Sequence, residues 1–440
     1  MPRPARACRR PLEVDPLQRL TRLPFLKRCR IPDDVRDVRS LGAEVPAREL
    51  GISQGRVERV WDAVEALYRT GVHPALQLCI RYRGQIVLHR ALGHARGNSP
   101  GDSADSPKIL ATTETPFCLY SASKAITAMV VHKLDERGVL HLEDRVCDFI
   151  PEFARHGKQR ITLRHVLAHR AGIPNLPRQA LDLELLESPE RVVELLCDSR
   201  PRSRPGRWLA YHAVSGGFVL GEVVRRVTGQ DIRSVLEKEI VEPLGFRWLR
   251  YGVAAADVPR VAVNATTGPP VPPPASTILR NALGTTLAHA VQISNDPRFL
   301  TGIIPAANVV ATADELSAFF QCLMEEGSLN GVRVFEPRTV QHATSEQTYY
   351  ELDLTLGVPI RYSLGFMLGG AISLYGVDNA EAFGHLGLSN ILGYADPGRE
   401  ISVGFLNSGK PVVASHVARL MRVVLEIGRA FPRRERGAAS

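Results

Sequence analysis

Apolar and polar residues alternate near both ends of this 440-residue chain, whereas its middle carries mostly helical patterns. The alternating segments are residues 76–82, 85–93, 362–368, 382–397 and 401–409. The first two are joined through Arg83 and Gly84, a connection that is typical of an antiparallel hairpin. Strands at both ends with helices between them predict an α+β fold. We expect one antiparallel sheet built from both chain ends, flanked by helices, with a mostly helical inserted subdomain.

Apolar residues at three- and four-residue steps predict the helices. The clearest helices span residues 56–68, 313–326 and 412–430. Thr312 or Asp314 is expected to cap the second of these helices. The Pro-rich stretch 264–280 is typical of a loop, either a flexible insertion or part of a lid.

The same patterns suggest a division of the chain. Residues 1–50 hold Pro and Arg at irregular spacing, which predicts an extended basic arm. Residues 51–440 are expected to form the main domain. Its α/β part would comprise about 56–120 and 300–435, and its helical part about 121–299.

Composition excludes several classes of function. The net charge is +9, but Arg is dense only near the N-terminus and aromatics make up 6% of the chain, so we expect no nucleic-acid partner. No apolar run approaches the roughly 18 residues of a membrane span, which predicts no stable membrane insertion. Seven cysteines without a CxxC spacing indicate reduced thiols, and no apolar core of a secretory signal is evident. We therefore expect a cytoplasmic protein.

The stretch from Phe117 to Gly138 places a hydroxyl and an amine three residues apart where a helix is expected to begin. Ser121 and Lys124 would then lie on one face of that helix. A serine at a helix N-terminus meets unpaired backbone N–H groups and the positive end of the helix dipole, which favour developing negative charge. These features indicate that Ser121 is a nucleophile.

Lysine is scarce in this sequence, supplying only seven of the 55 basic residues. Arginine does not lose its proton in a protein, whereas a buried lysine can. Lys124 is therefore suited to act as the general base that takes the proton of Ser121. Because Ser-x-x-Lys also occurs by chance, the interpretation depends on the motifs that follow.

Two other motifs have simpler explanations. Residues 51–55, GISQG, match the nucleophile elbow of α/β-hydrolases, but no buried strand precedes them, so we expect Ser53 to start a helix. His165 and His169 have the four-residue spacing of zinc ligands, but the Glu of the metalloprotease motif is missing and no third ligand is evident. We interpret both as structural histidines and expect no metal site.

Four motifs occur in order along the chain: YSASK at 120–124, ITLRHVLAHRAGIP at 161–174, PGRWLAYHA at 205–213 and FGHLG at 383–387. Together they resemble the serine β-lactamase and penicillin-binding-protein family, which includes DD-peptidases and class C β-lactamase-related serine esterases. The resemblance begins at about Val57 and continues to the end of the sequence. It implies a β-lactamase/transpeptidase-like fold.

The resemblance also implies roles for the matching residues. Ser121 would be the acylated nucleophile and Lys124 its base. Tyr211 matches the first position of the family's Tyr-x-Asn motif, where a phenol shares protons with the lysine and protonates the leaving group. A nearby ammonium would favour phenolate, so the pair would pass a proton near neutral pH.

A second part of the site would come from the end of the chain. His385, Leu386 and Gly387 match the family's Lys-Thr-Gly triplet on an edge strand. His385 would face the substrate, and Gly387 would let substrate backbone approach closely. The backbone N–H groups of Ser121 and Leu388 would form the oxyanion hole.

Two departures from the family pattern bear on the substrate. Ala213 replaces the Asn that binds a substrate amide, and His385 replaces the Lys that attracts the carboxylate of a β-lactam or peptide. Neither change removes the acylation machinery. We therefore expect a serine hydrolase that cleaves small-molecule carboxylic esters, carboxylesterase- or lipase-like, through an acyl-enzyme on Ser121 and without a cofactor.

Alternatives with the same sequence features are a β-lactamase or DD-peptidase, an acyltransferase, and a catalytically inactive binding or scaffold relative. The sequence does not indicate the oligomeric state, the acyl-chain length or the natural substrate.

Overall fold

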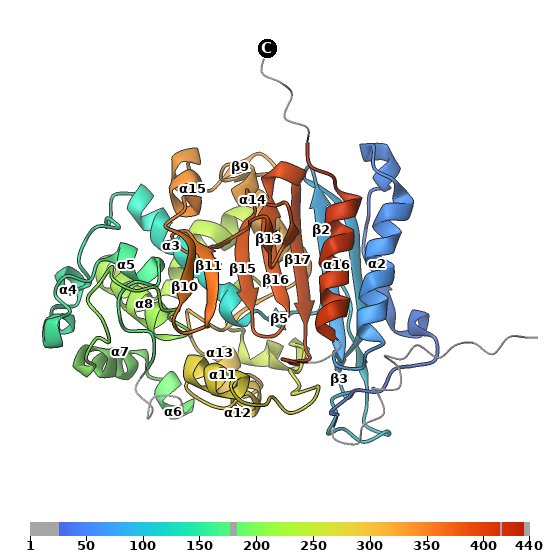
Figure 1. Ribbon diagram of the computed structural model, residues 1–440, viewed down its shortest axis with the longest axis horizontal. Coiled ribbons are helices and arrows are strands. Elements are labelled where there is room, and N and C mark those ends of the chain that lie inside the picture. The colour runs from blue at the N-terminus through green and yellow to red at the C-terminus, as the bar shows by residue number, and fades with distance from the viewer. Residues whose placement is uncertain (1–25, 177–182, 414–415, 435–440) are drawn as a thin grey trace, which may run out of the picture.

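The computed structural model describes residues 26–176, 183–413 and 416–434. A ten-stranded antiparallel sheet has the order β1-β3-β2-β17-β16-β15-β12-β11-β10, with β4 paired to β3 (Figure 1). Its strands are β1 (Arg39–Leu41), β2 (Ala75–Tyr82), β3 (Gln85–Arg96), β4 (Ile109–Leu110), β10 (Thr348–Asp353), β11 (Val358–Tyr362), β12 (Met367–Leu368), β15 (Phe383–Gly387), β16 (Ile391–Asp396) and β17 (Ile401–Asn407). The predicted α+β fold, with a sheet drawn from both chain ends, is confirmed.

The two ends of the chain meet where β2 pairs with β17. Leu76 of β2 lies opposite Asn407 of β17 in an antiparallel register. β2 continues into β3 through Arg83 and Gly84, whose φ angles are 51° and 78°. Positive φ at both central residues is what a two-residue hairpin turn requires.

Helices cover both faces of the sheet. α2 (Gln54–Tyr68) and α16 (His416–Ala430) pack against each other on one face, in front of the sheet in Figure 1, and α14 (Ala313–Met324) packs on the other. Alternate side chains of β2 pack on opposite faces of the sheet. Leu78 lies in the core with α2 and α16, and Cys79 lies in the core with α14.

Short helices form most of the chain between the two groups of strands (Figure 1). They are α4 (Val146–Phe149), α5 (Leu163–Leu167), α6 (Leu183–Leu186), α7 (Pro189–Asp198), α8 (Ser215–Thr228), α9 (Ile232–Leu236), α10 (Glu242–Leu244), α11 (Ala275–Leu283), α12 (Leu287–Ile293) and α13 (Pro297–Thr301), with α15 (Pro337–Thr344) further on. A small sheet joins β5 (Phe117–Cys118), β7 (Val309–Ala311) and β6 (Arg250–Tyr251), and two hairpins pair β8 (Ser328–Leu329) with β9 (Val332–Arg333) and β13 (Ile372–Ser373) with β14 (Gly376–Val377).

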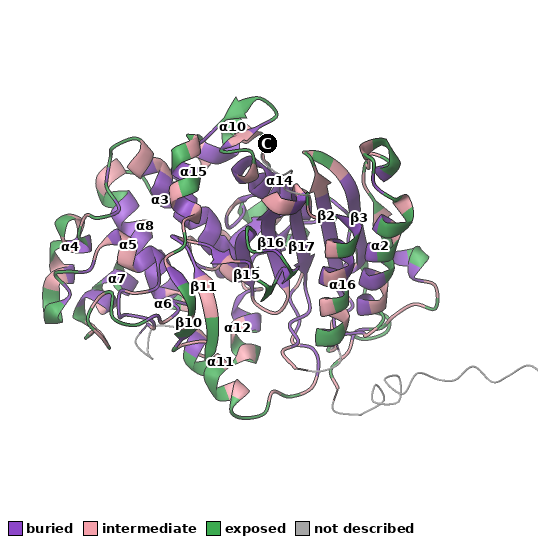
Figure 2. Ribbon diagram, turned by 45° about the horizontal axis from the view of Figure 1, so that its top comes forward, coloured by how far each residue is buried: buried purple, intermediate pink, exposed green. Residues whose placement is uncertain are grey.

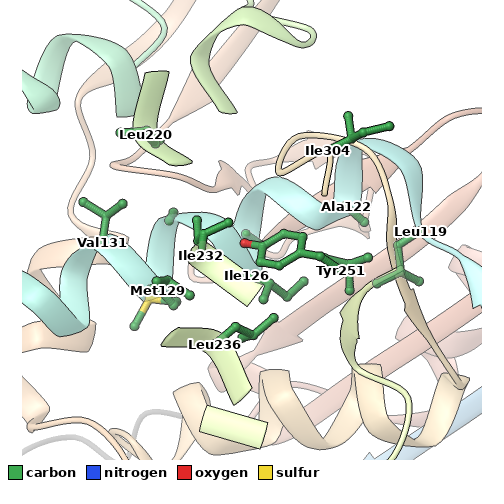
Figure 3. Packing of buried hydrophobic residues seen from close by; sticks show 14 of the residues in the cluster. Leu119, Ala122, Ile126, Met129, Val131, Leu220, Ile232, Leu236, Tyr251 and Ile304 are labelled. Carbon is green, nitrogen blue, oxygen red and sulfur yellow. The ribbon is translucent and has the colours of Figure 1, made fainter. Parts of the chain in front are cut away.

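Helix α3 (Ser123–Glu136) lies in the larger of the two cores. Every residue from 123 to 132 is buried, so this part of the helix has no face in contact with solvent. Ile126 and Met129 lie near Ile232 and Leu236 of α9 in that core (Figure 3). The start of α3 is therefore held in a fixed position by packing on all sides.

Two expected local features are confirmed. Thr312 caps α14, because its hydroxyl accepts the N–H of Glu315 while the Glu315 carboxylate accepts the N–H of Thr312. Ser53 stands directly before the first residue of α2, as expected for a helix-start residue, although its side chain forms no capping hydrogen bond.

The expected basic arm differs from the structure in its second half. Within residues 26–50, β1 pairs with β3 as an edge strand of the main sheet, and Val35, Val38 and Ala47 are buried. This segment therefore packs on the domain instead of extending from it, because its few apolar residues reach the core of α2. Residues 1–25 lie outside the described residues.

None of the described helices is long and apolar enough to cross a membrane. The six cysteines in the described part of the chain have free thiols. Cys8 lies outside the described residues.

Candidate active site

Ser121 lies in a 3-10 turn, Tyr120–Ala122, that leads directly into α3. Its side chain is partly exposed, whereas those of Ala122, Ser123 and Lys124 are buried. The chain therefore presents one hydroxyl at the N-terminal end of a buried helix, where backbone N–H groups and the helix dipole favour negative charge.

The residue before Ser121 is held in an uncommon conformation. Tyr120 has a φ of 48°, in the left-handed region that residues with a side chain seldom adopt. Its hydroxyl lies 2.6 Å from the Ser294 hydroxyl, and Nζ of Lys410 lies 4.8 Å from the centre of its ring. These contacts fix Tyr120 and so the direction in which Ser121 points.

Lys124 reaches Ser121 from the first turn of α3. Its Nζ donates hydrogen bonds to Ser121 Oγ at 3.2 Å and to the carbonyl oxygen of Ala306 at 3.0 Å. Among the described residues, no charged group contributes to its ionisation. Burial lowers the pKa of Lys124 from 10.5 to about 7, so a large fraction of the amine is neutral at neutral pH.

Tyr211 completes a group of three side chains around the serine. It lies shortly before α8, and its hydroxyl forms a side-chain hydrogen bond with Ser121. Nζ of Lys124 lies 4.9 Å from the centre of the Tyr211 ring. The structure thus brings together the three residues that the sequence assigns to catalysis.

The ionisation of Tyr211 differs from the expectation of a phenolate. Burial raises the pKa of Tyr211, which outweighs the opposing effect of its hydrogen bond with Ser121. Lys124 lies over the ring, and its own low pKa leaves little cationic charge to stabilise a phenolate. The phenol therefore keeps its proton near neutral pH and can donate it.

Three buried histidines surround Tyr211 without contributing a fixed positive charge. The rings of His169 and His385 lie with their centres 4.7 and 6.2 Å from that of Tyr211, and His169 Nδ1 accepts the backbone N–H of His212 at 3.2 Å. Burial is the main cause that lowers the pKa of His169 well below its usual value and that of His212 to about 4. Both rings are therefore neutral.

The two histidines with zinc-ligand spacing, His165 and His169, have different environments. His165 Nδ1 accepts the backbone N–H of Thr162 at 3.1 Å, at the start of α5. His169 instead adopts a φ of 58° just beyond α5 and turns toward Tyr211. The four-residue spacing thus places one histidine at a helix cap and the other beside the Tyr211 phenol.

His385 is buried on β15 and faces the same group of residues. Its Nδ1 lies 2.8 Å from the carbonyl oxygen of Leu386, which requires the proton to sit on Nδ1, and its Nε2 has no hydrogen-bond partner among the described residues. Burial, with a smaller effect of Lys124, lowers the pKa of His385 to about 3. This position therefore offers a neutral acceptor.

Gly387 allows a close contact within the protein itself. A Cβ atom at Gly387 would collide with the carbonyl oxygen of Leu119, two residues before Ser121. The glycine thus lets the end of β15 pack directly against the Ser121 segment. Leu388 follows in a half-buried position, and its N–H together with that of Ser121 stays our prediction for the oxyanion hole.

The family model described as Beta-lactamase matches residues 61–426. The chain belongs to the β-lactamase family. The ordered motifs around Ser121, Tyr211 and His385 all lie within the matched range, so the family resemblance of the sequence is confirmed.

Individual proteins of the family agree with this assignment. The esterase/β-lactamase LipL of Mycobacterium tuberculosis is 31% identical over 307 residues, which cover 65% of this chain and 67% of LipL. A family VIII carboxylesterase structure is 27% identical with a TM-score of 0.72, covering 87% of this chain and 98% of that one. A penicillin-binding protein homologue from Caulobacter crescentus, at 24% identity, has the same fold, with a TM-score of 0.73 and coverage of 89% and 100%.

In this β-lactamase-family protein, the site includes one further buried residue, Asp353, whose role the sequence does not reveal. It ends β10, and its Oδ1 accepts the backbone N–H groups of Tyr211 at 3.1 Å, Thr355 at 2.8 Å and Leu356 at 3.0 Å. Tyr211 stands in a segment without regular secondary structure, so this bond ties its backbone to the edge of the sheet. Asp353 is thus a positioning residue, and no sequence motif marks it.

Activity should rise with pH through the titration of Lys124. Only the neutral amine can take the serine proton, and its fraction grows as pH rises past about 7. The kcat/KM for an ester should therefore increase between pH 6 and 8, by the pKa above, and then level off. Lys124→Arg should lose about 10²- to 10⁴-fold in kcat, while Lys133→Arg on the same helix should keep its activity. Substantial turnover by Lys124→Arg would disprove the general-base role.

Loss of the Asp353 carboxyl should disturb Tyr211 more than it disturbs substrate binding. Asp353→Ala removes the acceptor for the Tyr211 N–H, so kcat should fall by roughly tenfold or more while KM changes little. Asp353→Asn keeps an acceptor oxygen but removes a charge that raises the pKa of Tyr211. Because it keeps that acceptor, Asp353→Asn should lose less in kcat than Asp353→Ala.

A buried aspartate elsewhere supplies the control for that experiment. Asp396 is as deeply buried as Asp353 but pairs with Arg399 at the far end of β16. Asp396→Ala should leave kcat unchanged in whatever fraction stays folded. If Asp353→Ala keeps the kcat of the parent protein in its folded fraction, Asp353 does not position Tyr211.

Proposed function

We propose that this protein hydrolyses uncharged carboxylic esters through an acyl-enzyme on Ser121. The observation that carries the proposal is the 3.2 Å contact between Ser121 Oγ and Nζ of Lys124, a buried amine whose pKa lies at about 7. A serine hydroxyl beside a neutral amine is an activated nucleophile. The similarity to the esterase/β-lactamase LipL and to a family VIII carboxylesterase supports ester cleavage as its reaction.

The first half of the reaction forms the acyl-enzyme. Lys124 takes the proton of Ser121 as Oγ attacks the carbonyl carbon, and the resulting oxyanion would accept the N–H groups of Ser121 and Leu388. Tyr211 then gives its proton to the departing alkoxide and recovers one from the Lys124 ammonium. The alcohol leaves, and the acyl group stays on Oγ.

The second half returns the enzyme to its starting state. A water molecule replaces the alcohol and attacks the acyl carbon, while Tyr211 and Lys124 remove its proton in the reverse order. Collapse of the second tetrahedral species breaks the bond to Oγ, which regains its proton from Lys124. The carboxylic acid is released, so one water molecule is consumed for each ester.

The residues beside the serine favour a substrate without charge. His385 is neutral, because burial and Lys124 hold its pKa at about 3, and its free Nε2 lone pair would repel a substrate carboxylate. Ala213 offers no side-chain partner to an amide. Both positions therefore suit an ester better than a β-lactam or a peptide.

An apolar cavity beside Tyr120 supports an apolar acyl group. Its volume is about 80 Å³, and its lining includes Tyr120, Val214, Phe299, Ile304 and Leu388, with no charged side chain. This is smaller than the cavity of about 150 Å³ that admits benzene in an engineered protein core. We infer that the acyl part is short.

Trapping the acyl-enzyme provides the direct test. Intact-mass measurement after mixing with p-nitrophenyl acetate, butyrate and palmitate and with a penicillin should show an adduct of the acyl mass from the short esters. Ser121→Ala should show none. A fluorophosphonate probe that leaves the parent protein unmodified would identify a catalytically inactive relative, and a stable penicillin adduct with no ester turnover would favour the peptidase alternative.

Restoring a cation at position 385 should shift the preference toward β-lactams. In His385→Lys, an ammonium would attract the carboxylate of a cephalosporin, so its kcat/KM relative to p-nitrophenyl butyrate should rise by roughly ten- to a hundredfold, as one charged hydrogen bond allows. His385→Gln is the neutral control. A similar ratio in both variants would show that charge at this position does not select the substrate.

A further inference from the structure

The hairpin of β10 and β11 exposes large apolar side chains at one edge of the main sheet. Leu352 and Leu354 project outward with 53% and 55% of their surfaces exposed, and Leu352 lies opposite Pro359 of β11. Figure 2 shows exposed residues along β10, β11 and α11, in neighbouring parts of one side of the molecule. Apolar residues grouped on a surface in this way indicate a contact site.

Two further apolar side chains extend this surface from other elements. Ile278 of α11 lies beside the hairpin turn, since a Cβ at Gly357 would be 3.8 Å from its Cδ1. Trp208, 43% exposed, precedes Leu209, whose carbonyl oxygen accepts the N–H of Leu354 at 3.0 Å. We call Trp208, Ile278, Leu352 and Leu354 the apolar rim.

The apolar rim adjoins the catalytic phenol. Trp208 stands three residues before Tyr211, and Asp353, between Leu352 and Leu354, holds the Tyr211 N–H. Because Tyr211 is assigned to protonate the departing alcohol, the alcohol part of an ester would point toward this side. The acyl part would occupy the cavity beside Tyr120.

Positive charge surrounds the apolar rim. Arg204, Arg207 and Arg280 are exposed, none forms an ion pair with another described residue, and the Arg207 guanidinium lies 4.9 Å from the Trp208 ring centre. The one acidic residue on the outer part of β10, Glu351, is paired with Arg170. The surface thus combines a tryptophan, aliphatic side chains and unpaired arginines, which suits an anionic lipid surface.

Strand addition by a second copy is less suited to this edge. The N–H of Leu354, directly after β10, already bonds to the carbonyl oxygen of Leu209, and the Glu351 side chain of β10 is paired with Arg170. A partner strand that extends along this edge would have to displace the Leu209 contact. A lipid surface needs only the outward side chains.

We propose that the apolar rim and its arginines seat the enzyme on an anionic lipid surface, from which esters with an apolar alcohol part reach Ser121. The choice of substrate rests on the proposed function, whereas docking itself does not require turnover. Docking of this kind is peripheral and inserts no helix.

Vesicle flotation with the Ser121→Ala full chain tests docking without catalysis. The protein should float with vesicles of equal parts phosphatidylcholine and phosphatidylglycerol, and much less with phosphatidylcholine alone or in about 0.5 M salt, where charge attraction is screened. Leu354→Glu and the pair Arg204→Glu with Arg207→Glu should each weaken binding by about tenfold or more.

The opposite edge of the sheet supplies matched controls. Leu41 on β1 is 59% exposed, and Arg48 and Arg56 on the same side of the sheet are also exposed. Leu41→Glu therefore matches the charge change of Leu354→Glu, and the pair Arg48→Glu with Arg56→Glu matches that of the Arg204 and Arg207 pair, away from the apolar rim. These variants should bind vesicles like the parent protein. If all variants, controls included, lose vesicle binding equally, the proposal is overturned. It is also overturned if no variant loses binding, because the Arg-rich residues 1–25 would then be the part that binds the vesicles.

Two more outcomes would also overturn it. Absence of binding to any vesicle, together with normal ester turnover by the protein with Ser121, would remove docking and leave the proposed function intact. Concentration-dependent dimerisation that Leu354→Glu abolishes, without vesicle binding, would assign the apolar rim to a second copy of the chain.

Discussion

A buried amine without a carboxylate partner, in contact with one hydroxyl, is the interaction on which this site depends. Burial alone lowers the pKa of Lys124 to about 7, and any nearby anion would reverse that effect. The packing of α3 on all sides is therefore part of the chemistry, because it excludes both water and counter-charge. The same exclusion keeps Tyr211 protonated and His385 neutral.

The fold brings this interaction together from three distant parts of the chain. α3 presents Ser121 and Lys124, the segment before α8 presents Tyr211, and β15 closes the third side. Gly387 lets β15 approach the Leu119 carbonyl, and Asp353 ties Tyr211 to β10. A conformational change in the sheet edge would thus reach the phenol before it reached the serine.

Much of this arrangement is predictable from the sequence, because it depends on local patterns. Alternation identifies β2, β3, β16 and β17, and the helix pattern with its early serine identifies α3. The scarcity of lysine does not by itself identify Lys124 as the base, since Lys158 and Lys410 are also buried. Only the position beside Ser121 distinguishes them. Asp353 and the conformation of Tyr120 depend on tertiary contacts, and the strand β1 depends on pairing with β3, so no local pattern reveals them.

The pairing of β2 with β17 also has a consequence during synthesis. Leu76 cannot pair until Asn407 has been synthesised. The ribosome must therefore add more than three hundred further residues before the central strands β2 and β17 can join. Until then the inner edge of β2 is open to other chains. We expect the nascent protein to rely on chaperones, and a chain that stops short of β17 to aggregate although its serine, lysine and tyrosine are all present.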